Sequence, residues 1–233
     1  MKTIGLIGGI TWYSTLEYYR VLNEEVNKRM GASHSARVII HSVDFAEIKA
    51  LTEKQDWAGI AAIMCREAKK MEASGASCIL IGANTMHKIA DEIQASINIP
   101  VIHIADAVAK SIEKKQLKKV ALLGTKYTMQ MDFYKNKLAG YNIQCIIPSQ
   151  AGIDYINEAI YNELAKGLFL PETKKQFLQI IDELAIQGAE GVILGCTEIP
   201  ILIKQEDCTI TVFDTTLIHA MAVVDFALDE HVK

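Results

Sequence analysis

The stretch Gly188-Ala-Glu-Gly-Val-Ile-Leu-Gly-Cys196-Thr-Glu198-Ile-Pro200 decides the fold of this chain. Its apolar run, residues 192–194, has the length and branching of a buried strand. Gly195, Cys196 and Thr197 follow where such a strand ends and a loop begins. The sequence therefore predicts that the Cys196 thiol faces a crevice at the end of a strand.

The same pattern occurs a second time, in Gly75-Ala-Ser-Cys-Ile-Leu-Ile-Gly82-Ala83-Asn84-Thr85-Met-His87. Ala83 corresponds to Cys196 at an offset of 196 − 83 = 113 residues, and Gly82 corresponds to Gly195 at the same offset. Upstream, residues 4–9 resemble residues 120–125, because each segment is an apolar run that ends in a turn of small residues. We therefore expect two copies of one α/β unit, whose equivalent strand ends would frame one site from opposite sides.

Composition limits the classes of protein to which this chain can belong. The chain has 233 residues and a net charge of −4, so its overall charge gives no indication of nucleic-acid binding. It contains no apolar run of about 18 residues, and its N-terminus leads directly into a strand. We expect no membrane span, no signal peptide and no nucleic-acid partner, and we predict a cytoplasmic protein.

The five cysteines do not form the pairs that disulfides or zinc sites need. Their number is odd and no Cys-x-x-Cys pair is present, which argues against a disulfide framework and a structural metal. Cys78 lies inside a predicted strand and Cys65 inside a helical pattern, so both are expected in the core. We predict no metal site, and Cys196 is the cysteine placed for chemistry.

Strands and helices alternate along the chain, which predicts parallel sheets with ligands beyond the carboxyl ends of the strands. The predicted strands are 3–9, 37–41, 78–81, 101–104, 120–124, 143–147, 192–194 and 212–214. The predicted helices include 12–29, 56–74, 128–139, 152–166, 171–187 and 217–229.

Two turns in the first copy have alternative explanations. Gly8 and Gly9, at a strand-to-helix turn, would let backbone N–H groups approach a carboxylate, but a tight turn alone explains them equally well. The spacing is not Gly-x-Gly-x-x-Gly, so a nucleotide cofactor has little support. For Asp44, helix capping is the preferred interpretation.

Several ordered motifs resemble the aspartate/glutamate racemase family, and within it the bacterial aspartate and broad-specificity amino acid racemases. The motifs are Ile7-Gly-Gly9 with Ser14-Thr15 and Tyr18-Tyr19, Asn84-Thr85-Met86-His87, Leu123-Gly-Thr125 with Thr128-Met129, Gly195-Cys196-Thr197-Glu198 and Phe213-Asp214-Thr215. The resemblance extends over essentially the whole chain. It implies an α/β fold of two pseudo-symmetric lobes, each a four-stranded parallel sheet flanked by helices, with the active site in the interlobe cleft.

The resemblance also implies a homodimer that acts on a small amino acid without a cofactor. We place the two lobes at residues 1–117 and 118–233, and leave open whether the C-terminal helix of each lobe packs on the other. Side-chain selection depends on the dimensions of the site, so the sequence does not decide between aspartate and glutamate.

Inverting an α-carbon requires one group to remove a proton and another to return a proton to the opposite face, which explains the doubled motif. The resemblance assigns the first task to Cys196, with Glu198 as the polar partner that receives the thiol proton. It assigns hydrogen bonds to the substrate carboxylate to residues of both copies, namely Asn84, Thr85, Thr125, Thr128 and Thr197. For Thr125 and Thr128, helix capping is an equally good explanation.

At the equivalent position in the first copy the chain departs from the family, because Ala83 stands where relatives have cysteine or threonine. A methyl group carries no exchangeable proton. Three explanations remain open: a deliberate substitution that traps a ligand, a substitute such as water, Thr85 or His87, or chemistry with one base only. Loss of a positioned acid or base costs about 10²- to 10⁴-fold in rate, so we expect slow racemisation.

Two other functions remain open. A decarboxylase that acts on a malonate-type acid would need only the thiol of Cys196, and a catalytically silent amino-acid-binding protein would need neither group. Among the histidines, His87 is assigned a supporting role and His103 a structural one. His34, His219 and His231 show no pattern.

Overall fold

The computed structural model describes residues 1–229, and its backbone contacts divide the chain into two compact units. Unit 1 comprises Met1–His103 together with the chain from His219 onward, and unit 2 comprises Ile104–Ile218. The division therefore falls after His103, whereas the sequence placed the lobe boundary after residue 117. His231 and the rest of the predicted lobe beyond residue 229 lie outside the described residues.

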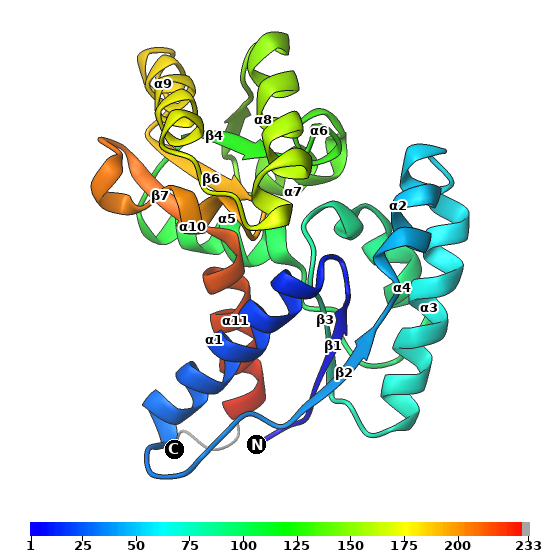
Figure 1. The fold of residues 1–233 in the computed structure, drawn as a ribbon. Helices are drawn as coiled ribbons and strands as arrows, with labels where there is room; N and C mark the ends of the chain where they lie inside the picture. Colours follow the sequence, from blue (N-terminus) through cyan, green and yellow to red (C-terminus); the bar gives the residue numbers. More distant parts are fainter. Residues whose placement is uncertain (230–233) are drawn as a thin grey trace. The chain divides into compact units, whose positions relative to one another are not determined.

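Unit 1 is built on a parallel sheet with the strand order β2-β1-β3 (Figure 1). The strands are β1 (Ile4–Gly8), β2 (Val38–Ser42) and β3 (Cys78–Ile81). The central strand β1 is fully buried and pairs with both neighbours.

The fourth strand expected in unit 1 is reduced to a single bridge between Ile79 and Val101. Ile79 N–H donates to Pro100 O at 2.8 Å, and Ile102 N–H donates to Ile79 O at 2.9 Å. Pro100 has no N–H to extend this ladder, and helix α5 (Ile104–Lys114) begins immediately afterwards. The expected strand at 101–104 therefore has no room to form.

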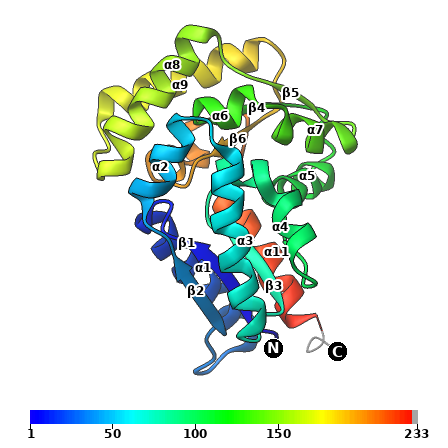
Figure 2. The ribbon, with the colours of Figure 1, turned by 90° about the vertical axis from the view of Figure 1, so that its right-hand side faces the viewer.

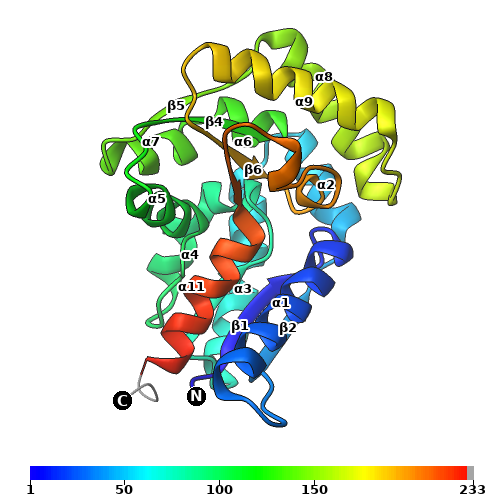
Figure 3. The ribbon, with the colours of Figure 1, turned by 90° about the vertical axis from the view of Figure 1, so that its left-hand side faces the viewer.

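Helices cover both faces of the first sheet. Helices α1 (Trp12–Met30) and α11 (Thr215–Leu228) lie on one face, in front of the strands in Figure 3. Helices α2 (Phe45–Glu53), α3 (Trp57–Ala73) and α4 (Ala90–Ser96) lie on the other, where Figure 2 shows α3 in front. Alternate residues of β1 serve the two faces, because Leu6 packs with the first helices and Ile7 with the second.

Unit 2 contains a parallel sheet with the strand order β5-β4-β6-β7. The strands are β4 (Lys119–Gly124), β5 (Gln144–Ile146), β6 (Gly191–Gly195) and β7 (Thr211–Asp214). This order matches β2-β1-β3 followed by the Val101 bridge. The repeat deduced from the sequence is thus a repeat of topology.

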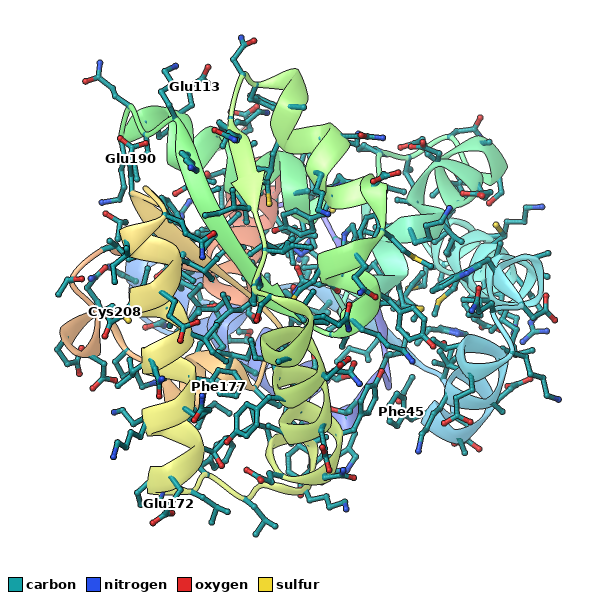
Figure 4. The ribbon with its side chains drawn as sticks, turned by 90° about the horizontal axis from the view of Figure 1, so that it is seen from above. Phe45, Glu113, Glu172, Phe177, Glu190 and Cys208 are labelled. Carbon is teal, nitrogen blue, oxygen red and sulfur yellow. The ribbon has the colours of Figure 1, made fainter. Side chains whose placement is uncertain are left out.

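The helices of unit 2 also form two layers. Helices α5 and α7 (Asp132–Gly140) pack on one face of the sheet, and α8 (Gln150–Asn162) and α9 (Pro171–Ile186) pack on the other. Figure 4 shows Phe177 on α9 beside α8, where its ring meets that of Tyr155 edge-on with centroids 6.3 Å apart.

Short helices complete the chain and divide two of the predicted helices. The helix predicted at 128–139 is split into α6 (Lys126–Gln130) and α7, because Met131 has an extended backbone. The helix predicted at 152–166 is α8 followed by the 3-10 turn η2 (Leu164–Lys166). The others are η1 (Thr85–Ile89), α10 (Ile199–Leu202) and η3 (Gln205–Asp207).

The repeat extends to the turns that precede β3 and β6. Gly75 and Gly188 have positive φ angles of 92° and 93°, each just after a long helix. Side-chain-bearing residues rarely adopt this conformation, so glycine is required at both turns. Within residues 1–229, no helix is both long enough and apolar enough to cross a bilayer.

Candidate active site

Close packing of backbones positions Cys196 at the end of β6. A Cβ atom on Gly195 would lie 2.7 Å from Leu123 O, and one on Gly124 would lie 2.8 Å from Gly195 O. Side chains cannot occupy either position without moving a strand. The first residue after β6 that can carry a functional group is therefore Cys196, at the carboxyl edge of the sheet, as the sequence predicts.

Cys196, Thr197 and Glu198 form a compact hydrogen-bonded group. The Cys196 thiol donates to Glu198 Oε2 at 3.0 Å, and the Thr197 hydroxyl donates to the same oxygen at 2.6 Å. Glu198 is 5% exposed and Thr197 is 9% exposed, so both bonds are largely shielded from water. The structure thus joins Glu198 to the thiol by a hydrogen bond, and the role of Glu198 as the acceptor of the thiol proton stays a prediction.

The environment of Cys196 keeps its thiol protonated. Burial raises the pKa of the Cys196 thiol well above its usual range, and the negative charge of Glu198 raises this pKa further. The resting site therefore holds a proton on sulfur, with a carboxylate oxygen ready to receive it. Such a pair can supply a thiolate only when the proton moves to Glu198 or leaves the site.

Thr125 and Thr128 pair with each other at the end of β4. The Thr125 hydroxyl accepts from Thr128 N–H at 3.3 Å and caps α6, and the two hydroxyl oxygens are 3.2 Å apart. The Thr128 side chain is fully buried beside Gly124 and Gly195. The structure shows the capping role of Thr125 and a packing role for Thr128, and their contact with a substrate stays a prediction.

The equivalent strand end in unit 1 carries Ala83, Asn84 and Thr85 in succession. Gly82 N–H donates to Ile7 O at 2.9 Å, and the Ser14 hydroxyl donates to Gly82 O at 2.6 Å. Ala83 is half-buried, Asn84 is buried, and Thr85 begins the 3-10 turn η1. The position equivalent to Cys196 is therefore anchored by neighbouring backbone and by α1, but its side chain is a methyl group.

Hydrogen bonds in the structure decide between the alternative explanations for Gly9 and Asp44. Gly9 N–H donates to Thr15 Oγ1 at 2.7 Å, and a Cβ at this position would lie 2.1 Å from Val43 O. Gly9 also has a φ angle of 89°, so the tight turn explains this glycine. Asp44 caps α2, as expected, by accepting from Ala46 N–H at 3.0 Å.

A cluster of three histidine rings lies behind the strand end of unit 1. The ring centroid of His87 is 4.7 Å from that of His103 and 5.4 Å from that of His219. His87 Nδ1 lies 3.0 Å from Ala83 O, and since a carbonyl only accepts, this nitrogen carries the proton. Burial and the neighbouring rings lower the pKa of His87 well below its usual range, which keeps this ring neutral.

This cluster includes two side chains, those of His219 and Tyr18, that the sequence did not place there. His219 Nε2 donates to Ile102 O at 2.6 Å, so its Nδ1 accepts from the Tyr18 hydroxyl at 2.9 Å. Tyr18 and His219 are 201 residues apart, so no local sequence pattern could join them. In the part of the chain from residue 1 to 229, no His, Cys, Asp or Glu group has an arrangement that could hold a metal ion.

Comparison with known proteins shows the family of this chain. The model of the Asp/Glu/hydantoin racemase family matches residues 7–223. The crystal structure of a putative Asp/Glu racemase from Yersinia pestis is 42% identical, with a TM-score of 0.93 over 98% of this chain and 100% of that one. An aspartate racemase homologue from Pyrococcus horikoshii OT3 is 38% identical, with a TM-score of 0.86 over 97% of this chain and 99% of that one.

A broad-specificity amino-acid racemase of Bacillus subtilis is 27% identical over 157 residues, which are 67% of each chain. The glutamate racemase of Francisella tularensis shares the fold, with a TM-score of 0.73 at 17% identity over 98% of this chain and 81% of that one. The family match spans nearly the whole chain and includes both strand ends. This chain therefore belongs to the Asp/Glu/hydantoin racemase family.

Proposed function

We propose that the protein is an amino acid racemase that acts on aspartate, glutamate or both without a cofactor. The observation that carries this proposal is the hydrogen bond from the Cys196 thiol to the Glu198 carboxylate, at 3.0 Å. It gives the sulfur a protonated resting state and a defined acceptor for its proton. Membership of the racemase family and the similarity to the putative Asp/Glu racemase support the choice of substrate.

In the proposed reaction, the thiol proton of Cys196 moves to Glu198 Oε2 and leaves a thiolate. The thiolate removes the α-proton of an L-amino acid, and the electron pair of the broken C–H bond delocalises into the substrate carboxylate. Hydrogen bonds to that carboxylate stabilise the resulting charge. We assign these bonds to both strand ends, namely to Asn84, Thr85, Thr125, Thr128 and Thr197.

Inversion needs a second proton donor on the opposite face of the α-carbon, and the repeat assigns this role to position 83. The methyl group of Ala83 cannot fill it. We therefore propose that removal and return of the proton by Cys196 is faster than inversion. The expected difference is about 10²- to 10⁴-fold, the usual effect of one positioned acid or base.

The test is incubation with each enantiomer of aspartate and glutamate in D₂O. α-Deuterium is measured by NMR, and the enantiomer ratio is measured separately by chiral chromatography. The proposal predicts rapid exchange of the L-enantiomers with slow inversion, and loss of both in Cys196→Ala. Absence of exchange with every one of these substrates would contradict it, and ligand binding without exchange would indicate a silent binding protein instead.

A further inference from the structure

One oxygen atom of Glu198 accepts two hydrogen bonds at the candidate active site. Oε2 receives the Cys196 thiol at 3.0 Å and the Thr197 hydroxyl at 2.6 Å. The second distance is short, as expected for a hydroxyl that donates to a charged carboxylate. The Thr197 hydroxyl is thus bonded to the oxygen that must receive the thiol proton.

Transfer of the thiol proton to Glu198 must change these two hydrogen bonds. When Oε2 takes the proton of Cys196, its negative charge disappears, and the charge-assisted bond from Thr197 loses most of its strength. A hydroxyl group has one donor and two acceptor positions, and its hydrogen rotates about the C–O bond. Thr197 can therefore accept from the protonated Oε2 while it directs its own hydrogen to another acceptor.

The acceptor whose negative charge increases at the same moment is the substrate carboxylate. In the proposed reaction, the α-carbon of the substrate contacts Cys196 Sγ, and its carboxylate is one bond away from that carbon. Negative charge develops on that carboxylate as the thiolate removes the α-proton. A donor released from Glu198 at this point stabilises the transition state more than the bound ground state, which is the condition for acceleration.

We propose that the hydroxyl of Thr197 switches between two acceptors during the reaction. It donates to Glu198 Oε2 while the thiol holds its proton, and to the substrate carboxylate once Oε2 has taken that proton. This inference rests on the proposed function and goes beyond it, because it gives Thr197 a role before any substrate is bound.

Cys196, on the same loop, shares Oε2 of Glu198 with Thr197. Removing the Thr197 hydroxyl removes a donor that the proposed reaction uses in the transition state. The rate of exchange at saturating substrate should therefore fall more than substrate binding does.

The experiment measures kcat and KM for α-deuterium incorporation from L-aspartate and L-glutamate by the wild type, Thr197→Val, Thr197→Ala and Thr197→Ser. For valine and alanine, we expect kcat for exchange to fall by roughly 10²-fold with little change in KM, because the lost bond acts in the transition state. Thr197→Ser keeps the hydroxyl and should keep a kcat close to that of the wild type.

Thr173→Val is the matched control. Thr173 is 2% exposed and its hydroxyl donates to the Glu163 carboxylate in the same unit, so valine removes the same type of bond away from Cys196. Its kcat for exchange should equal that of the wild type, although its thermal stability should fall. Thr197→Ala serves if the larger valine prevents folding.

Three results would overturn the inference. Thr197→Val or Thr197→Ala could keep the wild-type kcat for exchange, Thr197→Ser could lose as much of it as they do, or Thr173→Val could lose as much as Thr197→Val. Each would show that the hydroxyl of Thr197 has only a structural role, while exchange by the wild type would leave the proposed function standing. Failure of the wild type to exchange any substrate would instead refute both proposals.

Discussion

Replacement of His219 by glutamine tests whether buried neutral histidines make the fold sensitive to acid. His219 is fully buried, and burial lowers its pKa to about 3. The unfolded chain takes up a proton near pH 6.5, the reference value for histidine, whereas the folded chain does not. Below pH 6.5 the unfolded state therefore binds more protons, and stability falls as the pH decreases toward 3.

The expected size follows from these values. At pH 5.0, 1.5 units below the reference value, one such histidine costs about 2 kcal/mol of unfolding free energy relative to pH 7.5. His87 is also buried with a lowered pKa, so it adds to this loss in the same direction. Between pH 7.5 and 5.0, the wild type should therefore lose about 2 kcal/mol more unfolding free energy than His219→Gln does.

The assay is urea unfolding at the two pH values, followed by circular dichroism. Glu67 should not contribute to the difference between the two pH values. Its ion pairs lower the pKa of this carboxyl to about 2, so the stability that they supply is lost only below about pH 4.5. The exposed His34 supplies the control, since His34→Gln should keep the full wild-type loss. An equal loss in His219→Gln and the wild type would refute the reasoning.

Two further substitutions test the strand ends. Gly195→Ala places a methyl group 2.7 Å from Leu123 O and should lower the unfolding free energy, measured in urea, by about 1–3 kcal/mol. Gly140→Ala is the control and should not lower it, because nothing lies within 4 Å of the new Cβ. Equal stability of the two variants would contradict this packing argument. Ala83→Cys supplies a proton donor at the repeat-equivalent position and should raise the inversion rate in D₂O about 10²- to 10⁴-fold while changing L-enantiomer exchange little. If exchange and inversion rise together, position 83 does not serve the opposite face alone.

Much of the candidate site was predictable because its chemistry is local in the sequence. Cys196, Thr197 and Glu198 are consecutive residues after an apolar run, so a strand end with a thiol and a neighbouring carboxylate follows from pattern alone. The direction of the two bonds to Oε2 was not predictable, because it depends on side-chain rotamers. The sequence assigned Thr197 to the substrate, and the structure shows its hydroxyl bonded to Glu198.

The sequence predicted the fold correctly where the repeat is present. The prediction was wrong where local backbone chemistry prevented a strand from forming. The two strand orders agree because the same spacing of strands and helices occurs twice. The strand expected at residues 101–104 is a single bridge, since Pro100 lacks an N–H and α5 starts at Ile104. Apolar periodicity alone does not distinguish such a short run from the start of a buried helix.

By itself, the sequence determined the doubled α/β unit, the two glycine-bounded strand ends, and the thiol at one end with a methyl group at the other. These features depend on hydrophobic periodicity and on residues whose conformational limits are intrinsic. Only the tertiary structure decided which distant groups meet. Tyr18 and His219 meet because packing of α1 and α11 on the same sheet face brings together residues that the chain separates widely, and the ring of His87 on η1 lies beside that of His219.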